Sequence, residues 1–153
     1  MKRIIRLLVV LFSVLFLAVP SYAEDKGEPG GECSADKSES QNETEARWGI
    51  QVKSVRLTAA GYMLDFRYRV TDSEKASSIL NRQEKATLLH QESGTMMHVP
   101  RTRLGPMRQT SVKPAEDRDY LIFFANRNGM VKPGDKITVM IGDFKAEDLV
   151  VEE

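Results

Sequence analysis

The sequence predicts an all-β fold: an immunoglobulin-like antiparallel β-sandwich of about seven strands with one short helix. Three observations predict it. The chain contains short runs of apolar residues of strand length, turn signals recur about every eight to twelve residues, and roughly 100 residues have the composition of an ordered domain. Residues 48–153 show no internal repeat and are long enough for one domain but not for two.

The clearest predicted strand covers residues 62–70. Apolar and polar side chains alternate along it, as in Leu64, Asp65, Phe66 and Arg67. A period of two is typical of a strand with one buried face. We therefore expect Phe66 in the core and Asp65 and Arg67 on an exposed face.

The strand before it is expected over residues 49–57. Its apolar residues alternate imperfectly, and the phase slips between Val52 and Val55. Such a slip indicates a β-bulge near Lys53. Residues 59–61, Ala-Ala-Gly, form the turn between the two strands.

The rest of the domain is divided by turn residues such as Gly, Asn and Pro. We expect further strands over residues 86–91, 95–99, 119–125, 136–141 and 146–151. Strand 119–125 is apolar almost throughout, which predicts a central strand buried on both sides, and Tyr120 near its start suggests a tyrosine corner. Residues 72–82, capped by Thr71 or Asp72, are the helical candidate.

Residues 1–23 have the features of a cleavable secretory signal peptide. Three basic residues precede an apolar run, and residues 21–23, Ser-Tyr-Ala, place small residues at both positions that signal peptidase recognises. The run is shorter than the roughly 20 residues of a membrane span, and Pro20 ends it. We expect a periplasmic or secreted protein without stable membrane insertion; retention of the segment as an anchor is the alternative.

Residues 24–47 are predicted to form a disordered acidic tether. They contain eight acidic and three basic residues and almost no apolar ones, so they cannot bury enough surface to offset their ordering entropy. Without residues 1–23 the chain keeps 19 basic and 22 acidic residues, a net charge of −3. This balance does not attract a polyanion, so no nucleic-acid partner is expected. Cys33, the single cysteine, has no mate for an intramolecular disulfide.

Two stretches, residues 61–70 and 131–144, resemble sequences of an uncharacterised family of exported bacterial β-sandwich proteins. With the strands between them, the resemblance covers most of residues 48–151. It implies a sandwich fold in a bacterial periplasm, and it brings no catalytic motif with it.

Enzyme signatures are absent from the sequence. The chain has no G-x-S-x-G nucleophile turn, no glycine-rich phosphate loop and no H-E-x-x-H zinc motif. Asp117 and Asp119 flank Arg118 in a predicted solvated turn, which does not indicate acid–base chemistry. We therefore expect a protein that is not an enzyme.

Both histidines and two of the seven methionines fall in one predicted hairpin, residues 86–99. If Ser93-Gly94 is a two-residue turn, His90 faces Met97 across the hairpin at about 5 Å, and Met107 could add a third ligand. Thioether and imidazole donors favour Cu(I). The alternative interpretation is that these methionines only fill gaps in the core, and then no cofactor is expected.

Residues 100–114 are basic and contain no acid. Arg101, Arg103 and Arg108 belong to this segment, and its Pro and Gly residues predict a loop. Such a loop can bind an anionic partner, or it can simply keep the domain soluble.

These observations favour an exported, non-enzymatic binding or interaction module. Its partner is expected to be another periplasmic or envelope protein that contacts Arg101, Arg103 and Arg108. The alternative is a periplasmic Cu(I)-binding accessory protein that uses His90, Met97 and Met107. A hydrolase whose site is assembled from scattered residues is the third possibility.

Overall fold

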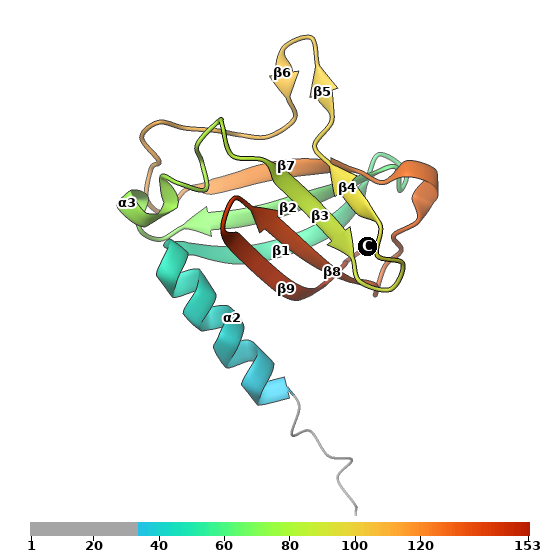
Figure 1. Cartoon of the computed structure of the whole chain (residues 1–153), viewed down its shortest axis with the longest axis horizontal. Helices are drawn as coiled ribbons and strands as arrows, with labels where there is room; N and C mark the ends of the chain where they lie inside the picture. Colours follow the sequence, from blue (N-terminus) through green and yellow to red (C-terminus); the bar gives the residue numbers. More distant parts are fainter. Residues whose placement is uncertain (1–33) are drawn as a thin grey trace, which may run out of the picture. The chain divides into compact units, whose positions relative to one another are not determined.

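The computed structural model describes the backbone of residues 34–153 and the side chains of residues 41–153. Two antiparallel sheets, with strand orders β1-β2-β7 and β4-β3-β8-β9, pack face to face (Figure 1). The prediction of an all-β sandwich is therefore confirmed, whereas an immunoglobulin-like strand arrangement stays a prediction. The predicted signal peptide, residues 1–23, lies outside the described residues.

The three-stranded sheet contains β1 (Ile50–Thr58), β2 (Met63–Val70) and β7 (Asp119–Ala125). The four-stranded sheet contains β3 (Ala86–His90), β4 (Met96–His98), β8 (Lys136–Ile141) and β9 (Phe144–Val150). A short ribbon of β5 (Arg101–Thr102) and β6 (Gly105–Pro106) forms a third, separate pair. Helices α2 (Ser34–Trp48) and α3 (Ser73–Ala76) and the 3-10 turn η1 (Arg127–Gly129) complete the described chain.

The core lies between the sheets, and β2 contributes to it as its alternation predicts. Leu64, Phe66 and Tyr68 are fully buried. The ring of Tyr68 stacks on Phe66 at 5.5 Å and on Tyr120 at 6.1 Å between centroids. The Tyr120 hydroxyl accepts a hydrogen bond from the Ala115 N–H at 3.0 Å, which is the backbone contact expected of a tyrosine corner.

The predicted bulge in β1 is confirmed. Val52 pairs with Tyr68 and Ser54 with Arg67, so Lys53 is the extra residue on this strand. The predicted helix is shorter than residues 72–82: α3 makes one turn, capped by Asp72, whose carboxylate accepts from the N–H groups of Glu74 and Lys75.

The composition of β7 predicted a central strand, and this prediction is wrong. The strand forms one edge of the sheet, and its side chains alternate between buried and half-buried. The edge is completed by residues 107–109: the Phe123 N–H donates to the Met107 carbonyl and the Gln109 N–H donates to the Leu121 carbonyl, both at 3.0 Å. This irregular segment pairs with β7 as a neighbouring strand would. Because the edge is covered, β7 can be more apolar than a free edge strand.

The outer face of β2 is less exposed than predicted. Asp65 is only 7% exposed, and its Oδ2 accepts a hydrogen bond from Nε of Arg67 at 2.8 Å. Arg67 is exposed as predicted, and its guanidinium neutralises the buried carboxylate of Asp65.

Residues 34–47, predicted to be disordered, form most of helix α2. The end of the helix is held against the sandwich: the Glu45 carboxylate accepts from the Val52 N–H at 3.0 Å, and the Trp48 ring meets Phe144 edge-on at 6.1 Å. Burial raises the pKa of the Glu45 carboxyl. Tertiary contacts thus order a segment whose own composition lacks a driving force for folding.

Gly49 ends α2 and turns the chain into β1. Its φ is +64°, and its carbonyl accepts from the N–H groups of Thr71 and Asp72 at 2.8 and 3.1 Å. A Cβ at this position would lie 2.7 Å from the Asp72 carbonyl oxygen and 2.9 Å from Cβ of Lys75. The turn therefore requires glycine both for its backbone angle and for the close approach of α3.

We expect Gly49→Ala to lower the free energy of unfolding by about 2–3 kcal/mol, because backbone strain and a steric clash act together. Gly94→Ala is the matched control. Gly94 has a φ of +66° with open space around it, so only the backbone strain of about 1 kcal/mol remains. Urea unfolding of both variants measures the difference, and equal losses would show that the packing of α3 against Gly49 is wrong.

Candidate functional site

The predicted basic loop is built around the ribbon β5–β6, which projects from the sandwich (Figure 1). Arg101 pairs with Pro106 and Thr102 with Gly105, so Arg103 and Leu104 form the tip. The Thr102 hydroxyl donates to the Gly105 carbonyl at 2.9 Å and accepts from the Leu104 N–H at 3.2 Å. This side chain fixes the two-residue turn and leaves both tip side chains in solvent.

The base of the ribbon is attached to both sheets. On one side the chain enters from β4, which pairs with β3. On the other side, Met107 donates its N–H to the Pro100 carbonyl at 2.9 Å and accepts from the Phe123 N–H of β7 at 3.0 Å. The ribbon is therefore a projection with a fixed base, which presents its tip in a defined direction.

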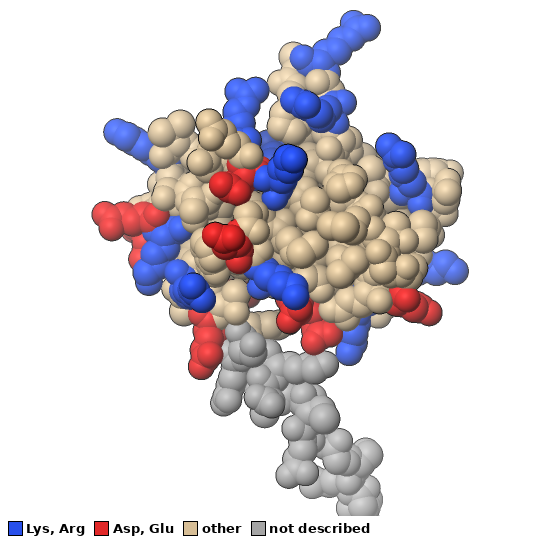
Figure 2. All heavy atoms as spheres, viewed as in Figure 1, with Lys and Arg blue, Asp and Glu red and all other residues tan. Residues whose placement is uncertain are grey.

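The surface of the ribbon is basic. Arg101 and Arg103 are exposed, and a Cβ built on Gly105 would lie 3.8 Å from Nη2 of Arg82, which places a third guanidinium beside it. In Figure 2 the tip of the projection carries basic side chains and no acidic ones. Among the side chains of residues 41–153, no carboxylate pairs with these three arginines, whereas the arginines at 56, 67 and 69 of β1 and β2 each pair with an acid.

Leu104 adds an apolar group at the tip. It is 98% exposed, more than any other large hydrophobic residue of the described chain. A single exposed leucine is ordinary on a protein surface, but here it lies between arginines at the end of a projecting ribbon. Apolar and guanidinium groups together are typical of contact residues in protein interfaces.

Arg108 does not belong to this surface, contrary to the prediction. Its Nη1 donates to the Glu84 carbonyl at 2.6 Å and its Nη2 donates to the Ile79 carbonyl at 2.7 Å. Burial lowers the pKa of its guanidinium. Arg108 thus fastens the turn that follows α3 to the edge of β7.

The predicted hairpin exists, but the predicted pairing of its strands is wrong: the partner of Met97 lies two residues earlier in β3. Met97 pairs with Leu88, and His98 with Thr87. The turn contains four residues, 91–94, because the Gly94 N–H donates to the His90 carbonyl and the His90 N–H donates to the Thr95 carbonyl, both at 2.9 Å. His90 consequently lies opposite Thr95.

The three predicted Cu(I) ligands are not brought together. Met97 is 4% exposed and belongs to the hydrophobic core, and Met107 lies at the base of the ribbon beside β7. The ring nitrogens of His90 lie near oxygen atoms instead: Nδ1 is 2.8 Å from Oγ of Ser93 and Nε2 is 3.3 Å from Oδ2 of Asp135.

A hollow of about 460 Å³ lies between β4 and the residues that follow β7, next to the base of the ribbon. Three methionines, one histidine and two arginines line it: Met96, Met97, His98, Arg101, Arg127 and Met130. Sequence reasoning missed Met130 and Arg127, because no local pattern connects them to β4. The hollow continues the basic surface and adds apolar walls to it.

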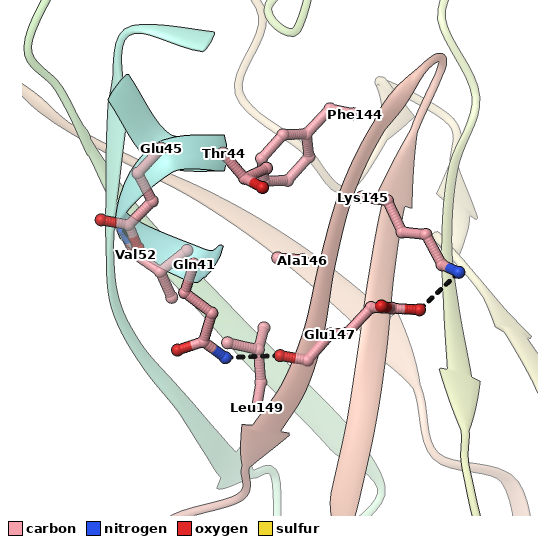
Figure 3. Close-up of a pocket in the computed structure, with 9 residues that line it drawn as sticks. All are labelled: Gln41, Thr44, Glu45, Val52, Phe144, Lys145, Ala146, Glu147 and Leu149. Atoms are coloured by element: carbon pink, nitrogen blue, oxygen red, sulfur yellow. Dashed lines mark hydrogen bonds and ion pairs between the residues drawn. The ribbon is translucent and has the colours of Figure 1, made fainter. Parts of the chain in front are cut away.

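A second gap, beneath α2, is lined by Gln41, Glu45 and residues of β1 and β9 (Figure 3). The Gln41 side chain donates to the Glu147 carbonyl across this gap. Its volume is about 50 Å³, enough for a water molecule or two. We interpret it as imperfect packing of the helix on the sandwich and not as a ligand site.

Comparisons of the chain with protein-family models, curated proteins and solved structures found no match. Among the described residues, no helix combines the length and apolarity needed to cross a bilayer.

Proposed function

We propose that the protein is an exported, non-enzymatic interaction module that binds an acidic segment of another envelope protein through the ribbon β5–β6. One observation carries this proposal: a projecting ribbon presents Leu104 in solvent between arginines that have no carboxylate partner among the side chains of residues 41–153. Arginines on the strands of the same domain are neutralised internally, so those of the ribbon remain available to a partner.

The chemistry of the surface indicates the kind of segment that it binds. Exposed guanidinium groups form bidentate, charge-assisted hydrogen bonds with carboxylates. Leu104 supplies an apolar anchor, and the hollow beside the ribbon can accept an apolar side chain of the partner. The expected ligand is a segment in which Asp or Glu residues surround at least one large apolar residue.

An anionic membrane would also attract the arginines, but it fits the surface less well. Stable binding to a bilayer surface takes a broad apolar face, or a cluster of about four to eight basic residues. The tip offers one large apolar residue, Leu104, and the arginines beside it are Arg82, Arg101 and Arg103. A protein segment is therefore the preferred partner.

Selection of random 12-residue peptides on the purified domain tests this proposal. We expect the selected peptides to be acidic with an apolar residue, and Arg101→Glu/Arg103→Glu to weaken their binding at least about tenfold, because attraction becomes repulsion. Lys53→Glu/Lys145→Glu on β1 and β9 changes the net charge equally and should leave the affinity unchanged. Equal losses in both variants, or binding to anionic vesicles without any selected peptide, would overturn the proposal.

Cu(I) binding is a second candidate function, with a different ligand set from the predicted one. The hollow favours it, because Met96 and His98 lie on the exposed face of β4 and Met130 lines the same hollow. One Cu(I) per chain, lost in Met96→Leu and retained in Met107→Leu, would support this function. Absence of stoichiometric binding would reject it.

A further inference from the structure

A group of metal-ligating side chains lies at the turn between β3 and β4, apart from the ribbon and its hollow. His90 ends β3, Glu92 follows in the turn, and Asp135 precedes β8. One ligand atom from each of these residues lies within 4.8 Å of the other two. The imidazole of His90 is 4% exposed, whereas the Glu92 side chain is open to solvent.

The contacts of Ser93 favour a proton on Nδ1 of His90. The Ser93 hydroxyl donates its single proton to Oγ1 of Thr95 at 2.9 Å and accepts from the Thr95 N–H at 3.3 Å. When the Ser93 proton is directed at Thr95, Nδ1 of His90 is the donor in the 2.8 Å contact between Ser93 Oγ and His90 Nδ1. In the neutral ring the lone pair is then on Nε2.

This lone pair faces negative charge. Nε2 of His90 is 3.3 Å from Oδ2 of Asp135, and it is buried without a hydrogen-bond partner among the described residues. The same carboxylate oxygen accepts from the Lys132 N–H at 2.8 Å, which fixes its position. A buried lone pair beside a carboxylate is unfavourable unless a cation lies between them, and that cation is either a proton or a metal ion.

We propose that His90 Nε2, Glu92 and Asp135 bind a divalent transition-metal ion, with Zn²⁺ as the best fit. Zn²⁺ accepts one imidazole and two carboxylate ligands, and a water molecule can complete a tetrahedral site. The hydrogen bond between Nδ1 and Ser93 orients the ring, as is usual for histidines that bind metals. The ion would connect the turn between β3 and β4 to the turn before β8.

Zinc titration of the EDTA-treated full-length mature protein tests the site. We expect one Zn²⁺ per chain, and an affinity at least about tenfold lower in Glu92→Gln, which removes a charged ligand from an exposed position without disturbing the core. Glu153→Gln, an exposed carboxylate elsewhere, and His98→Ala, which removes the other histidine of the chain, should leave the affinity unchanged.

Long-range ¹⁵N–¹H spectra provide a readout that does not depend on affinity. The chain has two histidines, so His98→Ala assigns both. Zinc should shift the Nε2 resonance of His90 while leaving the resonances of His98 unaffected. An Nε2 resonance of His90 that zinc does not change would overturn the proposal, as would zinc binding that is lost in His98→Ala. Neither outcome bears on the ribbon, which is tested separately through its arginines.

Discussion

Phe66→Ala should lower the free energy of unfolding by about 3–5 kcal/mol, a large share of the stability of a domain of this size. Phe66 is 0% exposed at the centre of β2, and its ring stacks on Tyr68 at 5.5 Å. The neighbouring strands β1 and β7 hold the backbone on both sides, so the structure cannot collapse into the cavity that the alanine leaves.

Tyr62→Ala is the matched aromatic control for this prediction. Tyr62 is 66% exposed immediately before β2, so its loss should change the stability by no more than about 0.5 kcal/mol. Urea unfolding followed by tryptophan fluorescence measures both variants. A larger loss for Tyr62→Ala than for Phe66→Ala would show that the burial of these two aromatic side chains is assigned the wrong way round.

Arg108→Met should lower the free energy of unfolding by about 2–3 kcal/mol. Methionine retains the apolar stem but loses the two charge-assisted hydrogen bonds to the carbonyls of Ile79 and Glu84. Those carbonyls would remain without a partner beneath the turn that follows α3.

Arg103→Met is the matched control: it should affect peptide binding and leave the stability almost unchanged. Arg103 is exposed at the tip of the ribbon, so Arg103→Met should change the stability by no more than about 0.5 kcal/mol. It should weaken the binding of acidic peptides, which folded Arg108→Met should not do. If Arg108→Met left the melting temperature unchanged and abolished peptide binding, Arg108 would be a contact residue after all.

The parts of the fold that the sequence predicts are those encoded locally. Alternation in β2, the phase slip at Lys53 and the turn at 59–61 each depend on neighbouring residues, and the structure contains all three. Helix α2 depends on contacts with residues far away in the sequence, from Gln41 to Glu147 and from Trp48 to Phe144, which no local pattern reveals. Asn126 is a residue type typical of turns, yet it is fully buried, and its side-chain amide donates hydrogen bonds to the carbonyls of Gly61 and Val131.

In the candidate site, too, the features that depend on contacts between distant residues could not be predicted from the sequence. Arg101 and Arg108 belong to one basic segment, but only the three-dimensional position of Arg108 shows that its guanidinium is buried against backbone carbonyls. The composition of residues 91–94 predicts a turn without specifying whether two or four residues form it. A difference of two residues leaves His90 on the same face but changes its neighbour from Met97 to Thr95.

Site-specific photocrosslinking in the cells that produce the protein would identify what the ribbon β5–β6 contacts. A photoreactive residue in place of Leu104 should capture a partner at an acidic segment, and Arg101→Glu/Arg103→Glu should abolish the capture. The same residue in place of Tyr62, also exposed but in the turn before β2, should not capture that partner. Capture from position 62 and not from position 104, or capture that survives the charge reversal, would contradict the assignment of the ribbon as the binding surface.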